Sequence, residues 1–481
     1  MARVTRRRFL QSAAAAGTAL PLVTAGRTKA SARVLGANDR IRVAVAGING
    51  RGKSHIDAFG DMQNVDVTYL VDPDSSLFDP RSSRVRDRGG NDPKCEQDIR
   101  RVLDDPDVDV VSVATCNHWH SLITIWACQA GKDVYVEKPL SHNVFEGRQA
   151  VAAARKYDRI VQHGTQNRSS PTRAREIAAV QSGKYGPLRV SKGYCCKPRW
   201  SIESKPIKEP PAHLDFDLWL GPAPEQPFHE NLVHYNWHWF WDTGNGDIGN
   251  QGVHEMDLAR WAIAGGTMPN KVHSLGGRYG YDDQGQTPNT QMAVFEYDDA
   301  LLVFEVRGLV ERETNIPRKV GNEYYTDEGM ITGGKFYPRG SSEGERLESF
   351  DVSVNRGGPF GSFINAVRSH SVDDLNADVL EGHYSSALCH LANVSYRLGQ
   401  DVPFNQAASQ IDESDPVVAG AHEALAHNLR DGLGLELADL DCRVGRSLDI
   451  NPEAERFVND AEADAHLTRP YREPYVVPAE V

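Results

Sequence analysis

Glycine residues and one carboxylate near the start of the chain have the types and spacing of a dinucleotide-binding site. Gly47, Asn49 and Gly52 occupy the three fixed positions of the pattern G-x-G-x-x-G, with Gly50 one place after the middle position. Backbone amides at a helix N-terminus hold a pyrophosphate, and glycine lets the phosphate approach the chain. Asp72 ends the next apolar run, where a carboxylate accepts the ribose 2′-hydroxyl of NAD and repels the 2′-phosphate of NADP. The pattern predicts NAD rather than NADP; an ordinary glycine turn with a solvated aspartate is the alternative.

The elements that must position this turn alternate between apolar strands and helices. Apolar runs predict strands at 41–46, 65–71, 108–114, 133–136 and 160–162. Helices are predicted directly after the glycine turn and at 121–130 and 144–157. Strands that alternate with helices form a parallel sheet covered on both faces. Residues 33–165 are therefore expected to form a doubly wound Rossmann domain.

The pattern changes after about residue 165 of the chain. The predicted elements are a helix at 172–181, strands at 188–196, 271–278, 290–297 and 301–306, and helices at 360–369 and 377–398. The later strands follow one another closely, which indicates an antiparallel sheet. We expect an α+β domain over 166–440, so that the chain as a whole is of the α/β class. Residues 441–481 are expected to wrap a neighbouring domain or subunit.

The composition excludes several classes of protein. With 481 residues, 40% hydrophobic and 25% charged, the chain has ample material for a packed core. A formal charge of −13 argues against a nucleic-acid partner, because phosphate binding draws on clustered Lys and Arg. Seven cysteines without a C-x-x-C pair argue against a zinc knuckle or a disulfide framework and favour buried free thiols. After the first 32 residues, no run reaches the ~18 apolar residues of a membrane span.

The first 32 residues have the pattern of a targeting segment. Thr5-Arg6-Arg7-Arg8-Phe9-Leu10 precedes an alanine-rich apolar stretch, an order that resembles the bacterial twin-arginine export signal. Ala30-Ser31-Ala32 is a candidate cleavage site, and Val23-Thr24-Ala25 is a second one. An uncleaved N-terminal anchor is the alternative. We expect the mature protein to be exported to the periplasm or another extracytoplasmic space.

Two further motifs resemble those of a known family. Thr115-Cys116-Asn117-His118-Trp119-His120 and Glu137-Lys138-Pro139-Leu140 follow consecutive predicted strands, and both resemble motifs of the Gfo/Idh/MocA oxidoreductases. The segment from His390 to Arg397 resembles the twin-arginine-exported branch of that family. The resemblance implies a Rossmann domain followed by a domain whose open, largely antiparallel sheet supplies the substrate pocket and the subunit contacts. It also implies a homodimer or homotetramer.

The same resemblance assigns the catalytic residues. The lysine of the family's E-K-P motif corresponds to Lys138, and the histidine of its H-x-x-D motif corresponds to His254. Oxidation of a secondary alcohol needs a base within reach of the hydroxyl group, and histidine serves near neutral pH. The lysine is a cationic donor for the developing alkoxide. One departure stands out, because Asn250 replaces an aspartate common in the inositol dehydrogenase branch, and Asp247 is the nearest carboxylate that could hold the site.

The glycine turn and the family motifs together predict the binding residues. Predicted cofactor contacts are Gly47, Asn49, Gly50, Arg51, Gly52, Asp72, Thr115, Asn117, His120, Glu137, Lys138 and Gln166. Predicted substrate contacts are Tyr194, Lys197, Arg199, Trp237, His238, Trp239, Trp241, Asp247 and Asn250, where aromatic rings suit the apolar faces of a pyranose. His234, His238, Asp242 and His254 match no specific metal-site spacing, so no metal is expected.

Three functions fit these observations. The first is an NAD-dependent oxidoreductase that acts on a secondary hydroxyl group of a sugar, glycoside or polyol. The second keeps NAD bound throughout, because no soluble NAD pool is expected outside the cytoplasm: the enzyme either passes hydride between two sugars or cleaves a glycoside by transient oxidation at C3 and elimination. The third is a non-catalytic sugar-binding relative. The tyrosine-rich signature of the related α-N-acetylgalactosaminidases is not matched before His254, which argues against that specificity.

Overall fold

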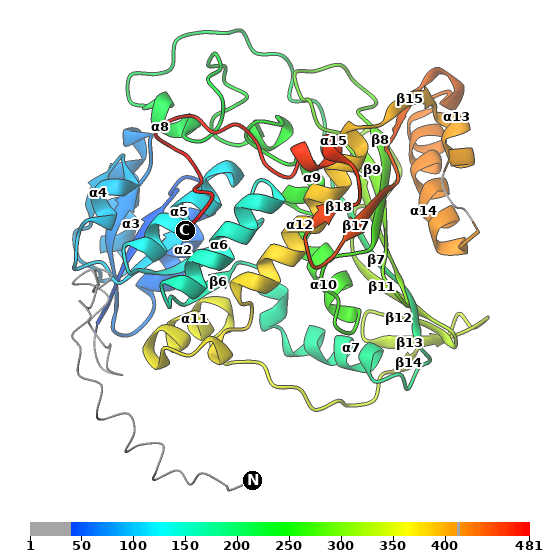
Figure 1. Cartoon of the computed structure of the whole chain (residues 1–481), viewed down its shortest axis with the longest axis horizontal. Helices are drawn as coiled ribbons and strands as arrows, with labels where there is room; N and C mark the ends of the chain where they lie inside the picture. Colours follow the sequence, from blue (N-terminus) through cyan, green and yellow to red (C-terminus); the bar gives the residue numbers. More distant parts are fainter. Residues whose placement is uncertain (1–39, 411–413) are drawn as a thin grey trace, which may run out of the picture.

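The computed structural model of the protein describes residues 40–410 and 414–481 and contains two sheets that lie side by side (Figure 1). The predicted export signal, residues 1–32, lies outside the described residues. The predicted class is confirmed: a parallel Rossmann sheet is followed by a domain with a mostly antiparallel sheet. Among the described residues, no helix is long and apolar enough to cross a membrane.

The first sheet has six parallel strands in the order β3-β2-β1-β4-β5-β6. The strands are β1 (Ile41–Ala46), β2 (Val65–Val71), β3 (Lys94–Glu96), β4 (Val110–Val113), β5 (Asp133–Val136) and β6 (Val161–His163). Five of them occur where the apolar runs predicted them. The short β3 was not predicted, because its residues are exposed or only half-buried and carry no apolar run. Strands covered on both faces are apolar throughout, which is why the other runs were visible.

Helices cover both faces of this sheet. One face packs against α2 (Gly52–Gly60), α3 (Phe78–Arg86) and α11 (Gly358–Ser369), and the other against α4 (Ile99–Leu103), α5 (Asn117–Gln129) and α6 (Val144–Lys156). Helix α11 comes from the second half of the chain, and its Phe360 ring stacks on Tyr135 of β5 with centroids 4.4 Å apart. One face of the first sheet is therefore covered by a helix that lies between strands of the second sheet in the sequence.

Helix α5 begins at Asn117, earlier than the predicted start at residue 121. The polar residues of its first turn are nevertheless buried, because the second domain supplies their hydrogen-bond partners. The His118 ring lies within 3.2 Å of the Thr243 carbonyl and within 3.0 Å of the Trp219 carbonyl. Contacts between the domains therefore stabilise an additional first turn of α5, which the sequence did not predict as helix.

The second sheet has 12 strands. Its centre is formed by β11 (Lys319–Thr326), β7 (Leu188–Cys196), β10 (Leu301–Arg307), β9 (Thr290–Glu296) and β8 (Lys271–Gly277). Only the β7 and β10 pair within this run is parallel. One face packs on α10 (Val253–Ala262) and α12 (Val379–Arg397), and α14 (Pro416–His427) packs on the other (Figure 1). The sequence did not predict β11, because only three of its eight positions are buried and Lys319 and Glu323 carry charge.

The last residues of the chain join both domains rather than forming a unit. Strand β16 (Asp441–Val444) pairs with β15 (Gln400–Pro403) and with β8 in the second sheet. Further on, Tyr475 and Val477 are buried in the core of the first domain, where the end of the chain lies beside α5 and α6 (Figure 1). Residues after 440 therefore wrap the chain's own two domains.

Candidate functional site

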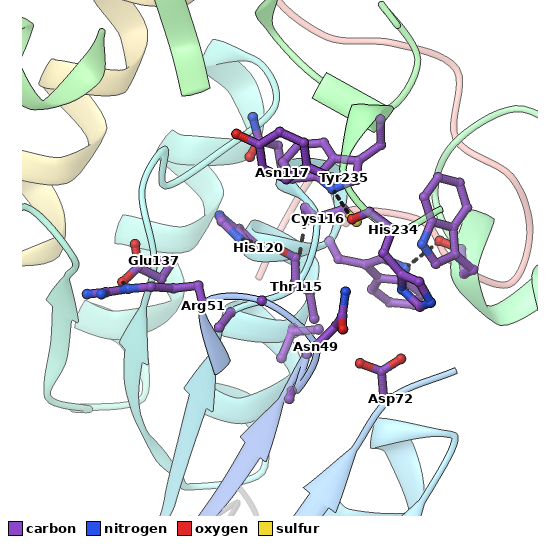
Figure 2. A pocket seen from close by; sticks show the side chains of 18 of the residues that line it. Asn49, Arg51, Asp72, Thr115, Cys116, Asn117, His120, Glu137, His234 and Tyr235 are labelled. Atoms are coloured by element: carbon purple, nitrogen blue, oxygen red, sulfur yellow. Dashed lines mark hydrogen bonds and ion pairs between the residues drawn. The ribbon is translucent and has the colours of Figure 1, made fainter. Parts of the chain in front are cut away.

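A cavity of about 430 Å³ lies where the carboxyl ends of β1, β2, β4 and β5 face the second domain. This edge of a doubly wound sheet is where nucleotides bind. Figure 2 shows Arg51 beside Glu137 on one side of the cavity and Asp72 at the end of its strand on the other. The predicted residues that line it are Gly47, Asn49, Gly50, Arg51, Asp72, Thr115, Asn117, His120, Glu137, Lys138, Gln166, Lys197, Arg199, Trp237, Asn250 and His254.

Two glycines of the turn pack so closely on the backbone that a side chain would not fit. Gly47 has φ +80°, and a Cβ atom there would lie 2.5 Å from the Ala114 carbonyl oxygen. A Cβ atom on Gly52 would lie 1.9 Å from the Gly47 carbonyl oxygen, whereas Gly50 faces open space. Gly52 also begins α2, so the free backbone amides of that helix point out of the turn. The turn fits the pyrophosphate of a dinucleotide.

Asp72 is held in place by backbone groups of the same domain. Its carboxylate accepts hydrogen bonds from the Ile48 amide at 2.9 Å and from the Asp74 amide at 3.0 Å. Burial raises the pKa of Asp72, and these two bonds oppose the rise. The side chain lines the cavity next to the turn, where a ribose hydroxyl group would find an acceptor.

Glu137 connects the turn to Lys138. Its Oε1 atom accepts hydrogen bonds from Arg51 Nε at 2.7 Å, His55 Nε2 at 3.2 Å and Gln166 Nε2 at 3.3 Å. Burial opposes ionisation, but His55, Arg51 and Lys138 hold the pKa of Glu137 well below its usual value. The carboxylate therefore fixes two predicted cofactor contacts, Arg51 and Gln166. His55 was not predicted, because it is buried under the turn and has no motif of its own.

Lys138 and His254 line the same cavity although they come from different domains. The Lys138 ammonium donates a hydrogen bond to the Asn250 carbonyl oxygen at the end of α9 (Gly246–Asn250). Burial lowers the pKa of Lys138, and the charges of Glu137 and Asp247 oppose this. Enclosure by protein and the nearby Lys138 charge lower the pKa of His254 to about 3. The site therefore presents a neutral imidazole and a nitrogen donor to the same space.

Asp247 does not line the cavity but fixes a residue that does. Its Oδ1 atom lies 2.9 Å from both Nε and Nη2 of Arg199, and the carboxylate is fully buried. Lys197 is held in a similar way, because its Nζ atom donates to Gln251 Oε1 at 2.7 Å. The predicted role of Asp247 in holding the site therefore takes the form of positioning Arg199, and the side chain has no access to a substrate.

Four other residues predicted to contact substrate also lie outside this cavity. Tyr194 is buried in the second sheet, with the Lys319 ammonium 4.2 Å from its ring centre. Trp241 packs against the Arg397 guanidinium at 5.2 Å. His238 lines a neighbouring cavity together with Trp239. Gly52, a predicted cofactor contact, also does not line the cavity. The residue types of Tyr194, His238, Trp239 and Trp241 suggested a substrate pocket, but the fold places their side chains outside this cavity.

The site includes residues that the sequence did not predict. Cys116, Trp219, His234, Tyr235 and Gln251 also line the cavity. Two histidines hold their segment over it, because His213 Nδ1 and His234 Nε2 each lie 2.8 Å from the Asp74 carboxylate of the first domain. No sequence motif predicts this contact, because Asp74, His213 and His234 are brought together only by the fold.

Glu255, the residue after His254, predicts a measurable dependence of stability on pH. Burial raises its pKa to about 7, and the bond from Gln251 and the charges of Lys197 and Lys138 only partly oppose this. The folded protein therefore loses stability as the pH rises from the unfolded pKa through about 7. Glu255→Gln is expected to remove this loss, making the variant more stable than wild type at pH 8 by about 3 kcal/mol but not at pH 4. Denaturant titrations at both pH values test this, and parallel pH dependence of the two proteins would contradict it.

Two family models match the chain. Residues 41–165 match "Oxidoreductase family, NAD-binding Rossmann fold", and residues 173–424 match "Oxidoreductase family, C-terminal alpha/beta domain". A glycosyl hydrolase family 109 protein of Shewanella pealeana is 30% identical over 169 residues, 32% of this chain and 37% of that protein. Levoglucosan dehydrogenase of Pseudarthrobacter phenanthrenivorans is 26% identical over 178 residues, 37% of this chain and 38% of that protein. The chain thus aligns with less than two fifths of the length of these relatives.

Solved structures share the fold over a larger part of the chain. The WlbA dehydrogenase of Bordetella pertussis, in complex with NADH and UDP-GlcNAcA, is 17% identical with a TM-score of 0.53, covering 73% of this chain and 94% of that chain. A levoglucosan dehydrogenase in complex with NADH is also 17% identical, with a TM-score of 0.53, covering 74% and 96%. At this identity the likeness shows the fold.

Proposed function

The chain belongs to the Gfo/Idh/MocA oxidoreductase family, and we propose that it transfers hydride between NAD and a secondary hydroxyl group of a sugar, glycoside or polyol. One observation carries the proposal: Lys138 and His254 line the same cavity as the glycine turn. A base and a cationic donor next to a nucleotide site are the groups that alcohol oxidation requires. A structural relative in complex with UDP-GlcNAcA and another named levoglucosan dehydrogenase support the choice of substrate class.

Each part of this reaction is assigned to particular residues of the chain. The amides of the glycine turn would hold the pyrophosphate, and Asp72 would accept a ribose hydroxyl group. Bound NAD would supply the hydride acceptor. The neutral imidazole of His254 removes the hydroxyl proton, and the Lys138 Nζ atom donates to the oxygen as negative charge develops on it. The Asn250 carbonyl and Glu137 keep that nitrogen in place.

The preference for NAD over NADP is assigned to the Asp72 carboxylate. Asp72→Asn keeps an acceptor for only one of the Ile48 and Asp74 amides, because asparagine has a single side-chain oxygen, and it removes the charge that would repel a 2′-phosphate. We expect the ratio of kcat/KM for NADP to kcat/KM for NAD to rise about tenfold or more, about 1.4 kcal/mol. Asp92→Asn, on an exposed turn, is the control and should leave the ratio unchanged. An unchanged ratio in Asp72→Asn would remove this role from Asp72.

Cellular location and assembly belong to the same proposal. The arginine motif before residue 9 supports export by the twin-arginine route, which carries folded proteins with cofactors bound. The family resemblance supports a homodimer or homotetramer. Detection of the protein in a periplasmic fraction, lost when Arg6 and Arg7 are replaced by lysine, tests the export route.

A second candidate function is a redox glycosidase that keeps its NAD. The similarity to glycosyl hydrolase family 109 proteins favours it, as does the absence of a soluble NAD pool after export. The protein purified without added cofactor is denatured to identify released nucleotide, and the native form is incubated with glycosides while NADH absorbance and free sugar are followed. Bound NAD with sugar release and no net NADH supports the glycosidase. An empty site and accumulating NADH support the dehydrogenase.

A further inference from the structure

A second cavity of about 400 Å³ opens beside the first and is not used by the reaction described above. It is formed by residues of two segments, 198–205 and 231–239, together with Arg312. Arg199 and Tyr235 line both cavities, so the two spaces meet at these side chains. Arg199 is fixed there by Asp247, and Tyr235 is 62% exposed at the rim.

Two buried polar atoms in the wall of the second cavity have no partner. His238 is 1% exposed, and its Nδ1 atom lies 2.8 Å from the Tyr235 carbonyl oxygen. Because a carbonyl only accepts, Nδ1 carries the proton of the neutral ring and Nε2 is left as an acceptor without a donor. The indole N–H of Trp200 is a buried donor without an acceptor. Such buried, unpaired groups destabilise the folded protein unless something pairs with them.

The charges of this cavity are largely neutralised. Lys205 lies 2.6 Å from Glu203, and Arg199 is paired with Asp247, so only Arg312 adds a charge that no pair of the described lining residues balances. What remains is aromatic surface from Trp200 and Tyr235 and the amide oxygen of Asn236. Trp239 adds little, because it is 2% exposed, and the Asn231 amide is already bonded to Gln284 and Asn236. Aromatic faces with a few neutral donors and acceptors suit an uncharged pyranose better than an anion.

We propose that this cavity binds a second, uncharged sugar unit, attached to the ring that is oxidised at Lys138 and His254. The inference rests on the proposed function and narrows its substrate class to glycosides of at least two sugar units. Tyr235 and Arg199 then lie at the linkage between the two rings. The unpaired His238 Nε2 and Trp200 N–H are the acceptor and donor for hydroxyl groups of the second ring.

Calorimetric binding to the NAD-loaded protein tests this without any need for turnover. The probes are disaccharides of glucose, galactose, mannose and N-acetylglucosamine, each compared with the methyl glycoside of its non-reducing ring. We expect at least one disaccharide to bind about tenfold more tightly than its methyl glycoside. Ser201→Trp, which places an indole in the second cavity, should abolish this preference and leave methyl glycoside binding unchanged. Ser341→Trp, on an exposed turn, is the matched control.

Asn236→Ala is a second, smaller substitution, included in case Ser201→Trp does not fold. It should reduce the preference for the disaccharide over its methyl glycoside about threefold or more. A panel in which no disaccharide exceeds its methyl glycoside, or a preference that survives Ser201→Trp, overturns the inference. Parallel NADH assays separate this from the proposed function. Selective binding without hydride transfer would refute the oxidoreductase proposal alone, whereas NADH formation with equal efficiency on both classes of probe would refute only the second sugar site.

Discussion

Lys138→Met is expected to lower kcat by about 10²- to 10³-fold while nucleotide binding is retained. The ammonium is placed by the Asn250 carbonyl and by the neighbouring Glu137, inside a buried site where a donor to a developing oxyanion has its largest effect. Loss of one such donor typically costs about 2.7–4 kcal/mol of transition-state stabilisation. Methionine keeps the apolar stem, so the change removes the charge and the donor but little packing.

The measurement is the rate of NADH formation in a single turnover, with nucleotide content and melting temperature recorded for each protein. Lys184→Met is the control, because its ammonium forms a surface pair with Glu348 and lies outside the lining of the cavity. A Lys138→Met protein that binds NAD and reacts within about threefold of wild type would show that another group stabilises the oxyanion.

His254→Asn is expected to lower kcat by about 10²- to 10⁴-fold, the usual contribution of a positioned general base. Because its pKa is lowered to about 3, the imidazole is neutral throughout the range from pH 5 to 8. The kcat/KM of the wild type for alcohol oxidation should therefore show no loss near pH 6.5, where an ordinary histidine becomes protonated. The same shift means that the unfolded chain binds the extra proton first, so folding stability falls as the pH drops from about 6.5 towards 3.

The reaction rate and its dependence on pH distinguish a catalytic base from a residue that only supports the fold. His370→Asn is the matched control, since His370 is exposed and caps α11 in a left-handed conformation that asparagine also adopts. It should react at the wild-type rate. An acid limb near pH 6.5 that disappears in His254→Asn would keep the base role but contradict the low pKa, whereas full activity in His254→Asn would remove the role altogether.

Much of the first domain was predictable because its signals are local. The strand at Ile41–Ala46, the glycine turn and the helix that follows form one continuous stretch, and the positive φ of Gly47 can be anticipated from the residue type. The predicted strands β2, β4, β5 and β6 are buried on both faces or nearly so, which leaves an apolar run in the sequence. Family motifs then placed Lys138 and His254, which no periodicity would have singled out.

The site as a whole needed the tertiary structure. Arg199 is held in place by Asp247 of α9, 48 positions later in the chain. The Asp74 carboxylate contacts His213 and His234, which are more than 130 positions away. Such partners share no spacing in the sequence. Arg199 meets Asp247 within the second domain, whereas Asp74 meets the two histidines where one domain packs on the other.

The sequence by itself determined the fold class, the nucleotide turn with Asp72, and the residue types suited to hydride chemistry, because these depend on short-range pattern and on motif. The tertiary structure decided which side chains face the cavity. It excluded Tyr194 and Trp241, turned Asp247 into a support for Arg199, and created the second cavity around His238. The physical reason is that burial and hydrogen-bond pairing of a side chain depend on neighbours that are distant in sequence and meet it only in the folded protein.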